Sequence, residues 1–211
     1  MTTVFVAGTG TDVGKTWVLV ELLSELRRRG HDVAARKPAQ SFAPEEVGST
    51  DAELLAAATD AQADTVCPGH RWYATPMAPP MAAAALGLPP FGINDLVREL
   101  DVAHTAGGAS VFVEGAGGPR SPLAADGDNV DLARAVGAQV AVLVADAGLG
   151  TINAVRLSVD ALTGFDTLVV LNRYDPTDDL HRRNRAWLAE AGYQVLTSVD
   201  ALVGAVEERL P

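Results

Sequence analysis

The chain has 211 residues, of which 48% are hydrophobic and 20% charged, so it is long enough to bury a core and too apolar to be disordered. The net charge of −11 argues against broad nucleic-acid binding, which requires a basic face. The single cysteine, Cys67, excludes an internal disulfide and fits a reducing compartment. The first residues lack the basic region of a signal peptide, and no apolar run reaches the about 18 residues of a membrane span. We therefore expect a single cytoplasmic domain over residues 1–211, without membrane association.

Five short apolar runs, rich in β-branched residues, predict buried strands. They occupy residues 3–7, 33–36, 110–113, 139–145 and 167–171. Helix-like segments separate most of them, which is the pattern of βαβ units. The sequence thus predicts an α/β fold with a mostly parallel central sheet and helices on both faces.

The connecting segments carry helix start and stop signals. The helix expected at residues 15–29 ends in three arginines followed by Gly30, which suits the negative end of a helix. Thr50 and Glu53 have the spacing of a capping box. Further helices that end at glycines are expected at residues 79–87, 92–108, 150–164 and 178–192.

The stretch GTGTDVGKT, which begins at Gly8, predicts a phosphate-binding loop between the first strand and the first helix. The common pattern G-x-x-x-x-G-K-[ST] would place a glycine where Thr9 stands, between Gly8 and Gly10. The context still fits, because a helix N-terminus offers free N–H groups and about half a positive charge to an anion. We expect Lys15 to neutralise terminal phosphate oxygens and Thr16 to place its hydroxyl on Mg²⁺.

Charged residues follow other predicted strands or open a helix. Ligands of parallel sheets bind beyond the carboxyl ends of strands, so Lys37 is expected near the phosphates that Lys15 approaches. Asp51 starts a helix, and Glu114 ends a buried strand before a run of glycines, where a carboxylate can hold Mg²⁺. Taken singly, each also fits a plainer role: a solvated lysine, a dipole-compensating aspartate or a solvated turn glutamate. Their combination favours a site.

Read together, these stretches resemble the dethiobiotin synthetase family, which has a P-loop NTPase-like fold. The matching segments, in the family's order, are GTGTDVGKT, Lys37-Pro38 with Ser41, Thr50-Asp51-Ala52, VEGAGG with Pro122-Leu123, and LGTIN at 149–153. The resemblance extends from the N-terminus to about residue 172. The family's loop has one residue more than the common pattern and its first glycine where Gly8 stands, which accounts for the shifted spacing.

The resemblance implies a cyclo-ligase of biotin biosynthesis. The family closes the ureido ring of dethiobiotin from 7,8-diaminopelargonic acid, CO₂ or bicarbonate and ATP, with Mg²⁺, and releases ADP and phosphate. One amine takes up CO₂ as a carbamate, the γ-phosphate phosphorylates it, and the second amine displaces the phosphate. The resemblance also implies a homodimer, because the LGTIN segment of a neighbouring subunit completes the substrate site.

The resemblance assigns the nucleotide and metal contacts by position. The nucleotide would be held by Gly10, Thr11, Asp12, Val13, Gly14, Lys15, Thr16, Glu114, Gly117 and Asn172. Asp12 stands where the family often has glutamate, and Asn172 where it commonly places a base-contacting asparagine. Mg²⁺ would be held by Thr16, Asp51 and Glu114.

The same resemblance assigns the catalytic and substrate roles. Lys15, Lys37 and Thr11 would stabilise the carbamate and the transferring phosphoryl group. The diamine substrate would be bound by Lys37, Ser41, Gly150, Thr151, Ile152 and Asn153, the last four through the amides of a helix N-terminus.

The chain departs from the family pattern at several places. Ala39 replaces a usual valine, Phe42 a usual small residue, and Ala154 a common histidine. The late G-x-I-P-x-L element, which lines the family's base pocket, is replaced by YQVLTSVDAL at residues 193–202. We therefore expect little preference among nucleoside triphosphates.

Three alternatives remain open. A partitioning ATPase of the same P-loop class would carry a second lysine inside the loop, which the chain lacks between Gly8 and Gly14. A carboxylate-amidating relative would need a glutaminase domain, for which 211 residues leave no room. A non-catalytic nucleotide-binding module is the third. The three tryptophans, Trp17, Trp72 and Trp187, are expected to be packing residues.

Overall fold

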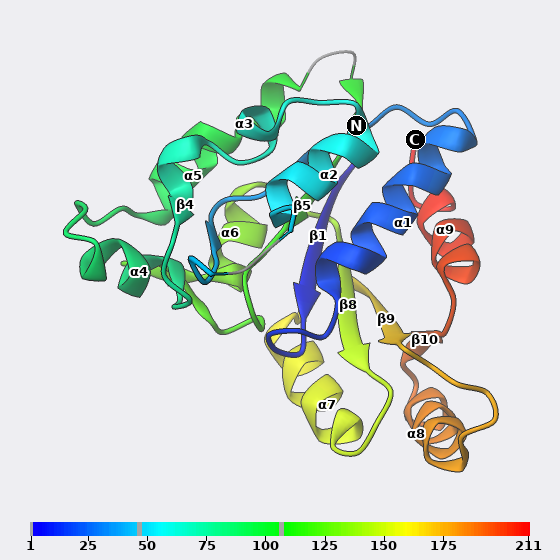
Figure 1. Ribbon diagram of the computed structural model, residues 1–211. Helices are drawn as coiled ribbons and strands as arrows, with labels where there is room; N and C mark the ends of the chain where they lie inside the picture. Colours follow the sequence, from blue (N-terminus) through cyan, green and yellow to red (C-terminus); the bar gives the residue numbers. More distant parts are fainter. Residues whose placement is uncertain (1, 46–47, 106–107) are drawn as a thin grey trace.

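The computed structural model describes residues 2–45, 48–105 and 108–211 (Figure 1). Its centre is a six-stranded sheet in the order β10-β9-β8-β1-β5-β2, in which every pairing is parallel. The strands are β1 (Thr3–Gly8), β2 (Val33–Arg36), β5 (Ser110–Glu114), β8 (Val140–Asp146), β9 (Asp166–Asn172) and β10 (Gln194–Leu196). The predicted α/β fold with a mostly parallel sheet is confirmed.

Side chains alternate between two cores, one on each face of the sheet. Val4 and Val6 pack into one core, whereas Phe5 and Ala7 pack into the other, as the period of two of a strand requires. Helices α1 (Lys15–Arg28), α2 (Asp51–Thr59), α3 (Ala63–Val66) and α9 (Val199–Glu207) contribute to the first core. Helices α4 (Pro79–Ala85), α5 (Ile93–Leu100), α6 (Asn129–Ala135), α7 (Thr151–Ala161) and α8 (Asp179–Glu190) contribute to the second.

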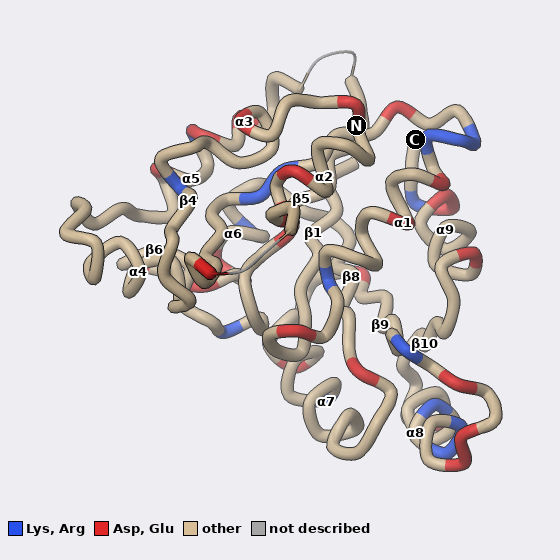
Figure 2. Tube along the Cα trace, viewed as in Figure 1, with Lys and Arg blue, Asp and Glu red and all other residues tan. Residues whose placement is uncertain are grey.

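Two small sheets lie outside the main one. β3 (Gln40–Ser41) pairs in parallel with β4 (Trp72–Tyr73), and β6 (Pro122–Ala124) pairs antiparallel with β7 (Gly127–Asp128). Acidic and basic residues are interspersed along the chain, and α8 carries both (Figure 2). Within the described ranges, every helix is too short or too polar to cross a bilayer.

The strand order positions the phosphate loop. From β1 the chain moves outward to β2, returns to β5 beside β1, and then crosses to β8 on the other side of β1. The loop that follows β1 therefore stands where the strand order reverses. In open α/β sheets, ligands bind in the crevice at this point.

Some expected helices differ from the structure. The single helix expected at residues 92–108 is wrong: α5 ends at Leu100, Asp101 adopts a left-handed φ of 43°, and a short 3₁₀ helix follows at Val102–His104. Residues 106 and 107 of that expectation lie outside the described part. The first helix ends at Arg28, with Arg29 as its cap, one residue earlier than expected. The sequence interpretation also missed α3, α6, α9, β10 and the small sheets.

Candidate functional site

The loop between β1 and α1 is anchored by its backbone. Thr9 N–H donates to the Val144 carbonyl at 2.8 Å. A Cβ atom at Gly8 would lie 2.7 Å from Cγ2 of Val13 and 2.8 Å from the Gly10 carbonyl oxygen, so only glycine fits there. Nothing lies within 4 Å of a Cβ built at Gly10. The close turn at Gly8 thus explains, in steric terms, why this loop's first glycine stands where it does.

Lys15 opens α1 and points back over the loop. Its side chain is only 8% exposed, and Nζ donates to the Gly10 carbonyl at 3.1 Å. Burial lowers the pKa of Lys15, while the nearby Glu114 carboxylate acts in the opposite direction. The ammonium therefore lies over the loop, and its contact with a phosphate stays a prediction.

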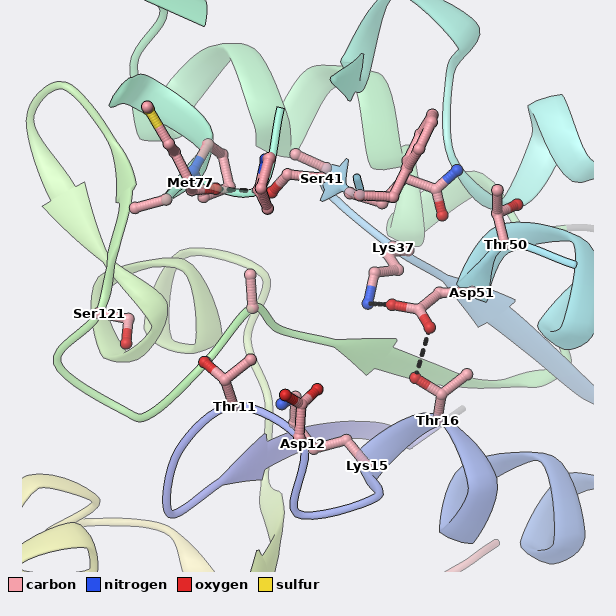
Figure 3. A pocket seen from close by; sticks show the side chains of 18 of the residues that line it. Thr11, Asp12, Lys15, Thr16, Lys37, Ser41, Thr50, Asp51, Met77 and Ser121 are labelled. Carbon is pink, nitrogen blue, oxygen red and sulfur yellow. Dashed lines mark hydrogen bonds and ion pairs between the residues drawn. The ribbon is translucent and has the colours of Figure 1, made fainter. Parts of the chain in front are cut away.

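Four polar side chains form a cluster at the carboxyl edge of the sheet, which we call the carboxylate cluster: Thr16, Lys37, Asp51 and Glu114. Lys37 Nζ lies 2.5 Å from Glu114 Oε1 and 2.6 Å from Asp51 Oδ2. The Thr16 hydroxyl lies 2.8 Å from Asp51 Oδ1 (Figure 3) and 2.9 Å from Glu114 Oε1, and it donates its one proton to either. These residues come from four separate segments, namely α1, the end of β2, α2 and β5.

The cluster is buried and charged. Lys37 is 3% exposed and Glu114 fully buried, so neither is the solvated charge of the plainer interpretation. Burial by itself lowers the pKa of Lys37, but Glu114 and Asp51 outweigh it, and the pKa is raised. Burial likewise opposes ionisation of Asp51, yet Lys37 and Thr16 hold its pKa below the usual value. Glu114 Oε2 is buried and has no hydrogen-bond partner among the described residues, which leaves it free for a ligand.

The first turn of α2 holds Asp51 in this cluster. Thr50 and Glu53 form the predicted capping box, with Thr50 N–H donating to Glu53 Oε2 at 2.7 Å. Gln40 Oε1 accepts from the Ala52 N–H at 2.9 Å, which ties β3 to the same turn. Gln40 is 3% exposed, and sequence reasoning missed it because no motif includes it.

A cavity of about 700 Å³ lies between the loop and the β3 region. Figure 3 shows Thr11, Asp12 and Lys15 on one side and Ser41 and Met77 opposite. Its walls include these predicted site residues: Thr11, Asp12, Gly14, Lys15, Thr16, Lys37, Ser41, Asp51 and Gly117. The rest of the lining is mixed, with apolar side chains such as Phe42 and Met77 and polar ones such as Ser49 and Thr50, and Ser41 Oγ donates to the Met77 carbonyl at 2.7 Å. The structure therefore brings a phosphate loop, a charge cluster and a wall of mixed polarity to one space.

The LGTIN segment does not join this cavity. Thr151, Ile152 and Asn153 begin α7, as predicted, and Gly150 is its N-cap with a left-handed φ of 93°. Of the described residues that line the cavity, none belongs to this segment. Leu149 is 92% exposed beside it. Within one chain, the predicted substrate residues are thus in two separate places.

A second cavity of about 520 Å³ lies on the other side of the loop and shares Gly14 and Arg173 with the first. Asn172 lines it, but its Nδ2 donates to the Val13 carbonyl at 2.9 Å and packs against Gly14. Trp17 also lines it and is 56% exposed, so the expectation that Trp17 is a packing residue is wrong. It is wrong as well for Trp187, which is 41% exposed.

Sequence comparison places the chain among known proteins. An AAA domain family matches residues 2–208. An ATP-dependent dethiobiotin synthetase of Anaeromyxobacter sp. (strain Fw109-5) is 44% identical over 83% of this chain and 78% of its own length. The Methylobacterium nodulans enzyme is 38% identical over 80% and 75% of the two chains. The Streptomyces avermitilis enzyme is 36% identical over 97% and 86%, so the match includes the divergent late region.

Solved structures support the fold. The signal recognition particle receptor FtsY of Elizabethkingia anophelis matches with a TM-score of 0.52 at 14% identity, over 93% of this chain and 57% of that chain. Chloroplast FtsY of Physcomitrella patens matches with a TM-score of 0.53 at 16% identity, over 94% and 60%. These likenesses concern the P-loop NTPase fold alone, whereas the sequence relatives disfavour the partitioning-ATPase alternative. The chain belongs to the ATP-dependent dethiobiotin synthetase family.

Proposed function

We propose that this protein is an ATP-dependent dethiobiotin synthetase, which closes the ureido ring from 7,8-diaminopelargonic acid, CO₂ and ATP in the cytoplasm. The observation that carries the proposal is the carboxylate cluster, in which Lys37 is buried between two carboxylates beside a phosphate loop. The names of the sequence relatives supply the reaction.

The first step needs a group that holds a carbamate. A neutral amine of the substrate attacks the carbon of CO₂, an N–C bond forms, and the nitrogen loses a proton. An ammonium has three N–H donors, and Lys37 gives two of them to Glu114 and Asp51, which leaves one for a carbamate oxygen. Its raised pKa keeps it protonated for this role. Thr11, on the same wall, offers a hydroxyl.

The next steps need positioning and charge stabilisation but no protein nucleophile. A carbamate oxygen attacks the γ-phosphorus, and the bond to the bridging oxygen breaks as ADP leaves. The second amine then attacks the carbonyl carbon, the C–O bond to phosphate breaks, and the amine gives up a proton. Lys15, whose Nζ lies over the loop, and the loop amides would stabilise the charge that develops on the transferring phosphoryl group.

The residues present fit Mg²⁺. Thr16, Asp51 and Glu114 offer only oxygen atoms as metal ligands. Glu114 Oε2 is buried and has no hydrogen-bond partner among the described residues. Magnesium sites in phosphoryl-transfer proteins use one or two carboxylates together with substrate phosphates. Bound there, the ion would neutralise phosphate charge during transfer.

A second copy of the chain would complete the substrate site. The substrate-binding segment at residues 150–153 lies outside the cavity of its own chain. Leu149 and Leu157, beside and on α7, are 92% and 63% exposed, and a second subunit would cover them. We therefore propose a homodimer in which α7 of each subunit faces the other subunit's cavity.

Complementation tests this sharing. Lys37→Ala and Asn153→Asp change opposite halves of the proposed site, the second by placing a negative charge beside the amides that would bind the substrate carboxylate, so each pure variant should have greatly reduced activity. After subunit exchange of an equal mixture, activity should return to about one quarter of wild type, because half the dimers then carry one intact site. No recovery, with exchange demonstrated, would contradict the shared site.

A coupled phosphate-release assay tests the reaction itself. Phosphate release from ATP should require both the diamine and bicarbonate. If the protein bound ATP yet released no phosphate when both were added, the synthetase proposal would be wrong.

A further inference from the structure

The second cavity is placed to receive the base of the nucleotide. It shares Gly14, within the phosphate loop, and Arg173 with the first cavity, so a nucleotide whose phosphates lie on the loop could place its base there. Its walls include apolar side chains of Val18, Val170 and Val199. A flat, largely apolar base fits such a wall.

Trp17 is the largest side chain that lines this cavity. It follows Lys15 and Thr16 directly on α1, and its indole is 56% exposed. The other two tryptophans have partners: Trp72 Nε1 donates to the Cys67 carbonyl at 2.9 Å, and Arg156 lies over the Trp187 ring at 5.6 Å. In the described part of the chain, Trp17 has no such hydrogen bond or aromatic partner. An aromatic face exposed on a cavity wall is the usual platform for a nucleobase.

Several polar groups around this cavity have hydrogen-bond partners within the protein. Asn172 gives one of its two amide N–H donors to the Val13 carbonyl at 2.9 Å, and the residue is 7% exposed. Arg173 donates to the Asp12 carbonyl at 3.1 Å, and Ser198 Oγ accepts from the Ala201 N–H at 3.2 Å. Strong discrimination between bases needs a paired set of free donors and acceptors.

We propose that the indole of Trp17 stacks on the nucleobase and that this stacking, rather than hydrogen bonding to base edges, holds the base. Every base has a π-face, so stacking tolerates purines and pyrimidines alike. The inference rests on the proposed function for its identification of the ligand as a nucleoside triphosphate. It replaces Asn172 with Trp17 as the main base contact and makes the protein tolerant of ATP, CTP, GTP and UTP.

Binding measurements without the diamine test the proposal. Trp17→Ala should weaken binding of each of the four Mg-nucleoside triphosphates by about 5- to 150-fold, the range for loss of one base–aromatic stack. Trp17→Phe should restore part of the loss. Inorganic tripolyphosphate, which has no base, should bind wild type and Trp17→Ala equally, which shows that the loop is intact. The matched control Trp187→Ala should bind all ligands like wild type.

The outcomes separate the inference from the function. Unchanged nucleotide binding by Trp17→Ala, or a wild-type preference for ATP of about a hundredfold or more over the others, would overturn the stacking proposal and leave the synthetase proposal standing. Weakened binding together with absent diamine-dependent phosphate release would support stacking and sink the synthetase reaction.

Discussion

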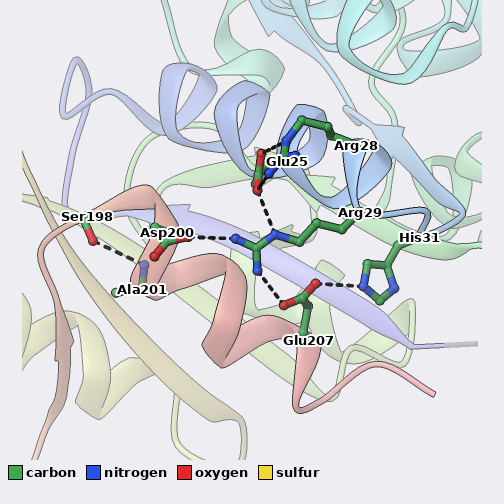
Figure 4. Close-up of polar contacts among 8 residues, drawn as sticks. All are labelled: Glu25, Arg28, Arg29, His31, Ser198, Asp200, Ala201 and Glu207. Carbon is green, nitrogen blue, oxygen red and sulfur yellow. Dashed lines mark hydrogen bonds and ion pairs between the residues drawn. The ribbon is translucent and has the colours of Figure 1, made fainter.

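The charged side chains at the two ends of α1 differ in their exposure to solvent. At its N-terminus, the carboxylate cluster holds Lys37 and Glu114 at 3% and 0% exposure. At its C-terminus, Arg29 donates to Glu25 at 2.7 Å, Asp200 at 2.7 Å and Glu207 at 2.9 Å, and ties α1 to α9 near the surface (Figure 4).

This difference in exposure distinguishes charges that serve function from charges that contribute to stability. Surface ion pairs are screened by water and salt, and each contributes at most about 1 kcal/mol. A buried charge pays a desolvation penalty of several kcal/mol, which its partners offset only in good geometry. The Arg29 network can therefore be lost at small cost. The carboxylate cluster, with its unpaired Glu114 oxygen, is costly to keep unless a ligand uses it.

The largest expected effect comes from Lys37→Ala. Removal of the buried ammonium should lower turnover by at least about 10²- to 10³-fold, the usual loss for one transition-state donor. Nucleotide binding should be largely retained, because Lys15 and the loop are unchanged. Arg29→Ala, at the other end of α1, is the matched control and should keep near wild-type turnover. A Lys37→Ala enzyme with near wild-type rate would refute the role given to Lys37.

Glu114→Gln keeps the side chain's shape and removes its charge. Because Glu114 contributes the free buried oxygen of the proposed magnesium site, the Mg²⁺ concentration for half-maximal phosphate release should rise by about 10- to 100-fold. Glu25→Gln, the same change in the exposed network, should leave the Mg²⁺ titration as in wild type. Equal titrations for wild type and Glu114→Gln would exclude Glu114 from the metal site.

Gln40→Ala tests how the cluster is positioned. Loss of the acceptor for the Ala52 N–H should lower the free energy of unfolding by about 1–2 kcal/mol. It should also lower kcat severalfold, because Asp51 sits on the loosened turn. Gln40→Glu retains an acceptor and should recover kcat in part. Chemical denaturation and phosphate release measure the two effects, and a loss of stability without any change in kcat would reduce Gln40 to a structural residue.

The smallest effect is expected from Glu25→Gln on acid stability. Hydrogen bonds from Arg28 and Arg29 lower the pKa of Glu25 from its ordinary 4.5 to about 2. A lowered folded-state pKa stabilises the protein above the unfolded value, and this contribution is lost as the pH falls. The Tm of wild type should therefore slightly exceed that of Glu25→Gln at pH 6, and the two should converge between pH 4.5 and about 2. A constant difference across this range would contradict the pairing.

The sequence predicted the parts of the site that depend on local order. From the glycines, the start of a helix and the charged residues at strand ends, we expected Lys15, Lys37, Asp51 and Glu114 to lie near one another. The structure brings them together, because parallel strands bring their carboxyl ends to one edge. The sequence did not predict the features that depend on tertiary packing. Asp101 breaks a helix whose pattern continues, and an indole on an amphipathic helix gives no sign in sequence of whether it faces a core or a cavity.

The role of residues 150–153 was inferred from resemblance, and one chain alone does not bring them to the cavity. A self-complementary interface leaves little trace in the sequence of one chain. The position of Gly8 shows the opposite case. The steric reason for a glycine at this position is visible only in the structure, where a Cβ atom would clash with Val13 and the Gly10 carbonyl oxygen.

Isotope tracing tests most directly the claim that the carboxylate cluster, not the exposed network, serves ring closure. Wild type and Arg29→Ala should convert ¹³C-bicarbonate, the diamine and ATP into dethiobiotin that carries the labelled carbon, with one ADP formed for each product molecule. Lys37→Ala should form it at least about 10²- to 10³-fold more slowly while it still binds ATP. Hydrolysis of ATP by wild type without labelled dethiobiotin, or labelled product from Lys37→Ala at the wild-type rate, would contradict the account.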